Sequence, residues 1–393
     1  MAICTGSVYT QRILRTECVG NSLVTINNNF QNLDLEACRL DNEVVATQNI
    51  IGGASPLLCG LRMSLDPTTP TPTTNRTGAG GATLYLHPYK GNVFSLYNTS
   101  TNKWDLYHLS SALNISLAGL AADTNFDVYL YNTGTFVAPV LALELIAWTN
   151  NLAGGVAPTR AYQDNVIVKL GTPSRRFIGC VRTTGTIGRS EQSFALYANG
   201  GGHAKQFVWN AQCNVLVTSS GFDREQYTIT TPGANPPLAA GDTGFKRVNA
   251  ATASQGKNNR FSFIVGDVTA VEAIGQVYAY DAIHTPTVFS VFGVNEEDDP
   301  YGSSIIGNPP TVGTYSQLLG EAKSSTTQGA SRAIARAHLK HNFQPGYHYL
   351  QLFERIDLNG TITTITMNRN VTVGGAGIDV NTGKTGIIAT LTN

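Results

Sequence analysis

Charged side chains are scarce in this chain of 393 residues. Asp, Glu, Lys and Arg make up 13% of it, and 26 basic residues balance 26 acidic ones to a formal net charge of zero. A protein that binds nucleic acid needs an excess of basic side chains to displace counterions from phosphates. The composition therefore argues against nucleic acid as a partner.

Long hydrophobic runs and paired cysteines are also missing. No run of 18 or more apolar residues occurs, so the sequence predicts no membrane insertion. The first ten residues show no basic segment followed by an apolar one, as a secretory signal would. The six cysteines stand without C-x-x-C spacing, which argues against a zinc site. We expect reduced thiols in a protein made in a cytosol.

Motifs that carry catalysis are absent as well. The glycine-rich segments 78–81 and 200–202 lack the Lys and Ser/Thr of a phosphate-binding loop, and no G-x-S-x-G sequence occurs. His338 and His341 would share a face only on a helix, and the acidic run 296–299 lacks the spacing of a calcium loop. The sequence predicts no catalytic residue, no cofactor and no metal, and hence no enzyme.

Small and uncharged polar residues are abundant instead. The chain holds 40 Gly, 45 Thr and 32 Asn, together about 30% of its residues. Threonine favours pleated surfaces, and Asn and Gly accept the positive φ of turns. This composition predicts a mostly β protein with many turns.

The N-terminal segment has a different pattern. Apolar residues recur at intervals of three and four over three heptads, which predicts a helix with one apolar seam. Two interpretations remain open: an amphipathic helix that lies on its own domain, or a short oligomerising bundle. The seam residues are Leu23, Ile26, Phe30, Leu33, Ala37, Leu40 and Val44.

Composition divides the rest of the chain. After an N-terminal anchor at 1–63, a Pro/Thr/Gly segment at 64–82 reads as an extended linker. Dense strand signals at 83–218 predict a first β-sandwich, in which 83–89, 93–97 and 104–109 form an antiparallel meander. A Gly/Pro-rich linker is expected at 219–244, and a second β-sandwich, jelly-roll-like, at 245–393.

Two features stand out in the second sandwich. Asn359-Gly360 predicts a two-residue turn that joins strands on either side of it. Residues 330–341 read as a strand rather than an Ala-rich helix, with small apolar residues on one face. The opposite face is a candidate ligand or interface face, formed by Arg332, Arg336, His338 and Lys340. Tyr347, Tyr349 and Phe353 alternate along a further strand, where packing is favoured over sugar stacking.

Several stretches together resemble structural proteins of tailed bacteriophage virions. GNSLVTINNNFQNLD, at 20–34, is similar to N-terminal segments of such proteins. An ordered series resembles a β-rich module of tail, fibre and other virion proteins: LYLHPYKGNVFSLYN, WDLYHLS, LAADTNFDVYLY, LALELIAWTN, DNVIVKLGTPSRRFIGCVRTTG and KQFVWN, between residues 84 and 210. More loosely, NFQPGYHYLQLFERIDLNGTITTITM, at 342–367, resembles the trimeric jelly-roll heads of the C1q and tumour-necrosis-factor type.

The resemblance implies a virion protein made in the cytoplasm of a bacterial host. We expect a homotrimeric tail fibre or tail appendage that contacts other virion proteins through its N-terminal segment and a host glycan or protein through its distal surface. The alternatives are a capsid decoration or head-fibre protein, a polysaccharide depolymerase, which would need two carboxylates in a groove, and a cellular adhesin.

Overall fold

The computed structural model describes residues 55–135, 138–151, 160–198, 203–223, 227–230, 246–247, 259–281, 287–294, 322–323, 331–357, 364–367, 371–372, 379–380 and 386–392. Within these ranges the chain forms 26 β-strands and one short 3-10 helix, η1 (Gly78–Gly81). The prediction of a mostly β protein is confirmed, and most of the strand pairs are antiparallel. The predicted seam from Leu23 to Val44 lies outside the described residues.

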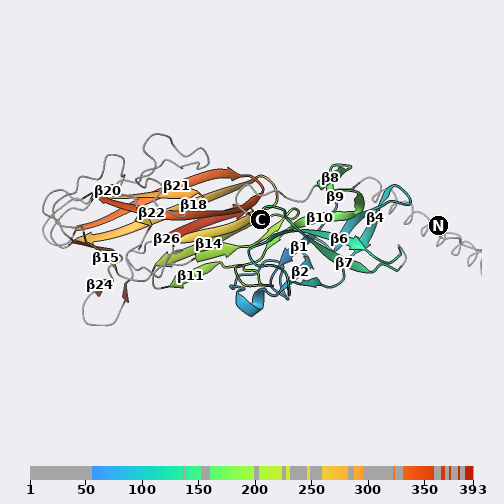
Figure 1. Ribbon diagram of the computed structural model, residues 1–393, viewed down its shortest axis with the longest axis horizontal. Helices are drawn as coiled ribbons and strands as arrows, with labels where there is room; N and C mark the ends of the chain where they lie inside the picture. The colour runs from blue at the N-terminus through green and yellow to red at the C-terminus, as the bar shows by residue number, and fades with distance from the viewer. Residues whose placement is uncertain are drawn as a thin grey trace, which may run out of the picture.

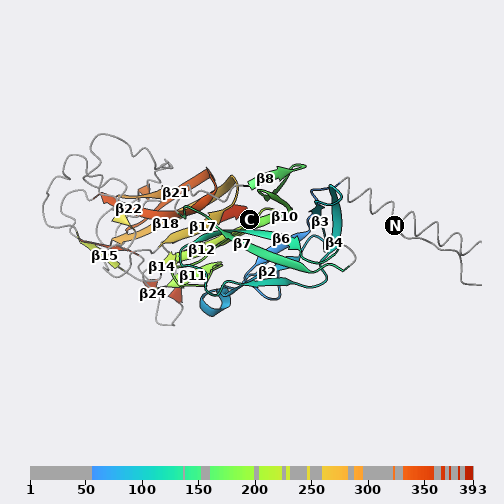
Figure 2. The ribbon, with the colours of Figure 1, turned by 45° about the vertical axis from the view of Figure 1, so that its right-hand side comes forward.

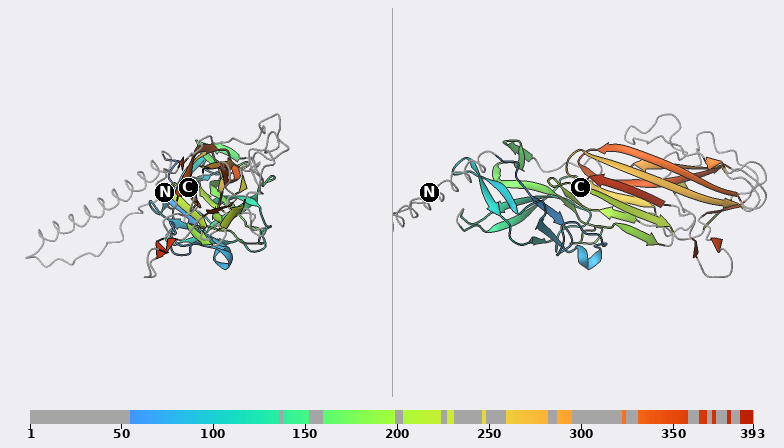
Figure 3. Two further views of the ribbon diagram at one scale, coloured as in Figure 1. Left: turned by 90° about the vertical axis from the view of Figure 1, so that its left-hand side faces the viewer. Right: turned by 180° about the vertical axis from the view of Figure 1, so that it is seen from behind.

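Two β units lie end to end along the long axis of the molecule (Figure 1), and the view turned by 45° shows the same arrangement (Figure 2). The first unit is built from β1 to β10 and β13. The second is built from the remaining strands, whose long members run nearly along the axis (Figure 3).

The first unit consists of three antiparallel sheets, β1-β2-β5, β3-β4 and β7-β6-β10-β9-β8, with β13 beside β10. Its strands are β1 (Leu61–Ser64), β2 (Thr83–Pro88), β3 (Val93–Asn98), β4 (Lys103–His108), β5 (Leu113–Ser116), β6 (Asn125–Asn132), β7 (Leu141–Ala147), β8 (Arg160–Gln163), β9 (Val166–Lys169), β10 (Thr172–Arg182) and β13 (Val208–Asn210).

Strand β6 is buried on both faces, and this explains how the units join. Successive side chains of a strand point to opposite faces. Phe126 and Val128 belong to the core of the first unit. Tyr129, on the opposite face of β6, belongs to the core of the second unit. Strand β13 divides in the same way, with Val208 in the first core and Trp209 in the second.

The second unit packs two sheets face to face. One sheet has the order β11-β14-β26-β18-β23-β15 with β21 beside β18, and the other has the order β12-β17-β22-β19-β20 with β16 beside β22; a separate pair is β24-β25. The strands are β11 (Ala195–Ala198), β12 (His203–Gln206), β14 (Leu216–Asp223), β15 (Tyr227–Thr230), β16 (Lys246–Arg247), β17 (Arg260–Val265), β18 (Thr269–Asp281), β19 (Thr287–Val294), β20 (Ala322–Lys323), β21 (Ser331–Phe343), β22 (Gly346–Asp357), β23 (Thr364–Met367), β24 (Val371–Thr372), β25 (Asp379–Val380) and β26 (Gly386–Thr392).

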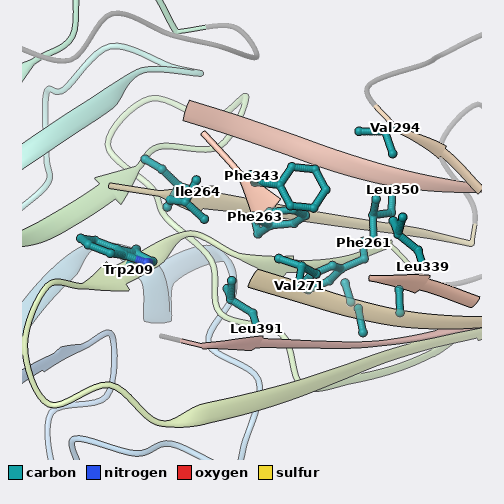
Figure 4. Packing of buried hydrophobic residues seen from close by; sticks show 14 of the residues in the cluster. Trp209, Phe261, Phe263, Ile264, Val271, Val294, Leu339, Phe343, Leu350 and Leu391 are labelled. Carbon is teal, nitrogen blue, oxygen red and sulfur yellow. The ribbon is translucent and has the colours of Figure 1, made fainter. Parts of the chain in front are cut away.

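The interior of the second unit is aromatic and aliphatic. Phe263 lies 5.1 Å from Phe261 and 4.9 Å from Phe343, ring centre to ring centre, so side chains of both sheets interdigitate. Figure 4 shows Val271 and Leu391, from the sheet that also holds Phe343, near Phe261 of the other sheet, with Trp209 at one end of the cluster. Burying each such side chain stabilises the fold by about 1.5–3 kcal/mol.

The segment 64–82, expected as an extended linker, is folded against the first unit. Leu65 is fully buried, and its backbone N–H donates to the Gln192 side chain at 2.8 Å. The Arg76 side chain donates to the buried carboxylate of Asp66. Burial raises the pKa of Asp66, but hydrogen bonds from Thr68 and Arg76 outweigh it and lower that pKa to about 2. Polar side chains that bond locally account for this folding of a Pro/Thr-rich segment.

Two expected strand pairings differ in the structure. β2 pairs β1 and β5, and β3 pairs β4, so residues 83–97 form no hairpin and only the second half of the expected meander is present. β22 pairs β16, β17 and β19, whereas β23 pairs β15 and β18. The strands on either side of Asn359-Gly360 therefore lie in opposite sheets, because each buries its apolar face from a different side of the core.

The border between the units also differs from the expected division at residue 218. β11 and β14 pair in parallel at the edge of one sheet of the second unit, and β12 pairs β17 in parallel in the other. The chain thus enters the second unit at β11, returns to the first unit at β13, and enters the second unit again at β14. Such double crossing leaves no local sequence signal, since it depends on contacts between distant segments.

Candidate interaction face

The outward side of β14, β26, β18 and β21 forms an open surface, which we call the long-strand face. Strand register places its side chains in rows: Ser220, Ile388, Ile274 and His338 form one row, and Thr218, Thr390, Glu272 and Lys340 form the next. Beyond these rows, Leu216 pairs with Thr392 and Ala270 pairs with Asn342.

Strand β21 supplies the basic residues that the sequence singles out. The predicted strand at 330–341 is confirmed, and Ala337 and Leu339 point into the core. Arg336 and Lys340 are exposed and His338 is half-exposed on the opposite face. Arg332 lies on β21 in the same alternation, although the structure does not describe its side chain.

One carboxylate lies among these basic groups. The Nε2 atom of His338 lies 2.8 Å from Oε1 of Glu272 on the neighbouring strand, and Lys340 is the register partner of Glu272. Both side chains of the pair are well exposed, at 43% for His338 and 55% for Glu272. A contact this open contributes little to folding stability.

The centre of the face is apolar, which the sequence analysis missed. Ile274 and Ile388 are register partners on β18 and β26, and 47% and 40% of their surface is exposed. Leu216, two rows away on β14, is 74% exposed. Each residue alone is an unremarkable surface hydrophobe; only the pairing of β26 with β18 and β14 reveals the group. Strand alternation predicts that these side chains point outward, but not which strands lie beside one another.

A second group of functional-type side chains lies where the units meet. The buried carboxylate of Asp127 accepts two hydrogen bonds from the Arg160 guanidinium, at 2.7 and 2.8 Å, and one from Trp148 Nε1 at 2.8 Å. Arg160 also donates to the backbone oxygen of Gly266 in the second unit. Its guanidinium lies 4.1 Å from the ring centre of Phe177. We call this group the junction cluster.

Burial shifts the titration of the junction cluster. Desolvation lowers the pKa of Arg160, but its hydrogen bonds to Asp127 together with the charges of the neighbouring acidic groups outweigh that effect and raise the pKa above its usual range. Burial and the charge of Asp127 raise the pKa of the Cys180 thiol well above its usual value. A thiol held protonated is a poor nucleophile. The cluster therefore suits structural bridging better than covalent chemistry.

A third contact joins the units beside the junction cluster. The Arg182 guanidinium, on β10, lies 3.9 Å from the ring centre of Tyr347 on β22 and donates to Asn125 at 2.7 Å. Burial lowers the pKa of Arg182. Phe207 meets Tyr347 edge-on at 6.0 Å between ring centres. The Arg260 guanidinium likewise lies over an aromatic ring, 4.1 Å from the ring centre of Tyr349. The two tyrosines are thus engaged in packing, as the sequence predicts; the Phe353 side chain lies outside the description.

The described residues form neither a metal-binding cluster nor a membrane-spanning helix. Among the residues that the structure describes, no three His, Cys, Asp or Glu side chains come together in a way that could hold a metal ion. Within the same ranges, no helix has the length and apolar character needed to cross a membrane.

Comparison with known proteins gives little. No family model matches the sequence, and no curated protein matches it. A structure of infectious bursal disease virus, strain Gx, is 9% identical with a TM-score of 0.22, over 85% of this chain and 72% of that one. A Bacillus thuringiensis Cry1Da tryptic core variant is 7% identical with a TM-score of 0.14, over 79% of this chain and 48% of that one. At these TM-scores neither likeness bears on fold or function.

Proposed function

We propose that the chain is a non-enzymatic structural protein of a bacteriophage virion, a homotrimeric tail fibre or tail appendage that contributes to host attachment. The observation that carries the proposal is the firm end-to-end junction of two β units, beside which one sheet face remains open. The resemblance of residues 84–210 to virion modules supplies the virion context.

The junction suits a protein that must hold its two units in a fixed arrangement. Tyr129, Phe177 and Trp209 of the first unit share one hydrophobic cluster with the core strands of the second. Interfaces between domains are usually polar and allow relative motion, whereas a continuous apolar core resists it. An appendage that holds a binding surface at a fixed distance from a virion needs this resistance.

The finer architecture belongs to the same proposal. The two units are taken as β-sandwiches, the second jelly-roll-like, and residues 1–63 as a helical anchor whose seam, Leu23 to Val44, brings three copies together. That segment also docks on other virion proteins. The second unit then carries the surface for a host glycan or protein, and trimeric avidity raises a weak affinity at each site.

Labelling of intact particles tests this proposal. Antibodies against the purified chain are applied to virions produced from the genome that encodes it, and gold particles are located by electron microscopy. Label on the tail supports a tail appendage. Label on the capsid shell favours the decoration or head-fibre alternative, and absence of the chain from washed virions overturns the proposal.

Adsorption separates attachment from a purely architectural role. The purified full-length chain, added to host cells before phage, should lower adsorption if its second unit binds the host surface. A truncation at residue 244 is unsuitable, because β14 and β12 would lose their partners β26 and β17. Unchanged adsorption at saturating protein would contradict a role in attachment.

A further inference from the structure

We propose that Cys59 and Cys213 are a redox-sensitive pair, which a small disulfide such as oxidised glutathione converts into one intrachain disulfide. Both thiols are free in the structure, and they lie 154 positions apart in the sequence. The bond would join the segment that enters the first unit to the segment that leaves it. This inference goes beyond the proposed function and does not depend on the oligomeric state.

The two cysteines lie side by side in the first unit. Sγ of Cys213 lies 3.3 Å from the backbone oxygen of Cys59. Covalent geometry holds the backbone oxygen and the Cβ atom of one residue about 3 Å apart, so at most about 6 Å separates Sγ of Cys213 from Cβ of Cys59. In a disulfide this separation is about 3 Å. Rotation of a cysteine between staggered rotamers moves its sulfur by about 3 Å, which supplies the remaining approach.

Hydrogen bonds hold the two backbones beside each other. From β1, the Arg62 guanidinium donates to the backbone oxygen of Cys213 at 3.1 Å. The backbone N–H of Met63 donates to Oδ1 of Asn210 at 2.6 Å, and Nδ2 of Asn210 donates to the backbone oxygen of Met63 at 3.2 Å. Arg62 and Asn210 are almost completely buried, so water does not compete for these contacts. The segment that carries Cys213 is therefore fixed on β1.

The backbone conformation of Cys213 is unusual. Its φ is 54°, in the left-handed region that few residues other than Gly, Asn and Asp adopt. The hydrogen bond from Arg62 helps to keep the residue in this conformation. The fold thus keeps a thiol next to Cys59 at a position where glycine or asparagine would be less strained.

The exposure of the two thiols sets the order in which they react. Cys213 is partly exposed, whereas Cys59 is buried. Burial and the neighbouring Cys59 raise the pKa of the Cys213 thiol, and the charges of Lys90 and Arg62 act in the opposite direction. Because the thiolate is the reactive form, the reaction should be slow at neutral pH and faster in mild alkali.

Oxidation proceeds by two thiol–disulfide exchanges. The thiolate of Cys213 attacks one sulfur of oxidised glutathione, the S–S bond breaks, and one glutathione thiolate leaves with the electron pair. The thiol of Cys59 then loses its proton and attacks Sγ of Cys213, which releases the second glutathione thiolate. The two protons pass through water to these thiolates, so one protein disulfide and two molecules of reduced glutathione are formed.

The disulfide would connect the entry and the exit of the first unit. Cys59 follows a segment that Arg176 holds through the backbone oxygens of Pro56 and Leu58, at 2.8 and 3.0 Å. Cys213 lies between β13 and β14, and every described strand from β14 onward belongs to the second unit. Tension between the N-terminal segment and the second unit would then pass through the S–S bond instead of through the strands of the first unit.

Peptide mapping of the full-length chain tests the proposal. The folded protein is incubated with oxidised glutathione near pH 8.5, where a thiol of ordinary pKa is about half ionised. Remaining thiols are then blocked with a maleimide at neutral pH in denaturant, and the chain is cut with trypsin. Cys59 and Cys213 fall in separate tryptic peptides, 40–62 and 206–224, each with no other cysteine. We expect these two peptides to be linked, and a reductant to separate them.

Three results of the mapping would overturn the proposal. In the first, both peptides carry the maleimide after oxidation. In the second, glutathione stays on Cys213 and no link to Cys59 forms. In the third, either cysteine is linked to a different one of the six. Each result would show that the two sulfurs do not meet in the folded chain.

Thermal unfolding gives a second readout. A disulfide that closes a loop this long restricts the unfolded chain, so oxidation should raise the unfolding temperature by about 5–10 °C. Cys213→Ser, at a partly exposed position, should show neither the linked peptide nor the increase. Cys38→Ser keeps both members of the pair and should behave as the unaltered chain. An equal increase in Cys213→Ser would place the oxidation elsewhere and overturn the proposal.

Discussion

Two carboxylate contacts, one at the junction of the units and one on the long-strand face, have similar geometry and different consequences. Arg160 meets Asp127 at 2.7 Å, and His338 meets Glu272 at 2.8 Å. The side chains of the first pair are 14% and 0% exposed, those of the second 43% and 55%. Breaking a buried pair leaves a charge without solvent, whereas water replaces a lost partner at the surface.

The surroundings of the two pairs widen this difference. The carboxylate of Asp127 also accepts hydrogen bonds from Trp148, at 2.8 Å, and from the hydroxyl of Tyr129, at 3.1 Å. The pair at the junction is therefore held by several neighbours that link the two units. The contact on the long-strand face joins only His338 and Glu272, and solvent reaches both side chains.

Removal of Arg160 should have the largest effect. We expect Arg160→Met to lower the free energy of unfolding by about 3–5 kcal/mol, because Asp127 stays buried without its cation. Urea unfolding measures the change. Arg175→Met is the matched control, since Arg175 pairs with Glu144 at 2.7 Å near the surface and its loss should be small. A loss below about 1 kcal/mol for Arg160→Met would contradict the role of the junction cluster.

The buried His348 should make the stability of the chain depend on pH. Burial, together with the nearby His341, lowers the pKa of His348 to about 4, against 6.5 when the side chain is free. The unfolded chain therefore binds more protons between these values, and stability should fall by about 3 kcal/mol as pH drops from 6.5 to 4.

A variant isolates this contribution of His348. Thermal unfolding is followed across the pH range, and His348→Gln, which keeps a donor for the backbone oxygen of Gln344, should flatten the slope. Equal slopes in the unaltered chain and in His348→Gln would contradict the assignment.

A methyl group added at the junction should have an intermediate effect. A Cβ atom on Gly266 would lie 2.5 Å from the ring of Trp209 and 2.7 Å from Sγ of Cys180. We expect Gly266→Ala to destabilise the chain by about 1–3 kcal/mol, since a packed core resists extra volume. Gly80→Ala is the control, because its Cβ would contact only Arg76, at 3.9 Å. Equal urea unfolding midpoints for the two variants would show that the junction accommodates the added methyl group without loss of stability.

The smallest effect is expected on the long-strand face. Glu272→Gln removes the carboxylate near His338 and should change the free energy of unfolding by less than about 0.5 kcal/mol, because water replaces the interaction. Urea unfolding measures this directly. A decrease in the free energy of unfolding as large as that of Arg160→Met would contradict the expected difference between the buried and the exposed contact.

The sequence predicted what depends on short-range patterns. Alternation along β21 separates Leu339, which is buried, from Lys340, which is exposed, and the turn before Lys103 pairs β3 with β4. It failed where strand pairing depends on distant segments. Ile274 and Ile388 are 114 positions apart and become neighbours only through β26, and Arg160 reaches Gly266 across 106 positions.

The physical reason is that a strand shows which face is apolar but not which strand lies beside it. The apolar run 93–97 fits several partners, and the choice is made by the whole core. For the same reason the residues of the candidate face on β21 were predicted, whereas its apolar centre, contributed by β18, β26 and β14, was not.

The oligomeric state of the full-length chain tests the central claim most directly. Light scattering should give about three times 41.9 kDa for the unaltered protein and one chain for the double variant Leu33→Asp, Leu40→Asp, because charges in an apolar seam disrupt a helical bundle. Circular dichroism of the variant checks that its β-structure is retained. A single-chain mass for the unaltered protein, or a mass that the double substitution leaves unchanged, would contradict the account.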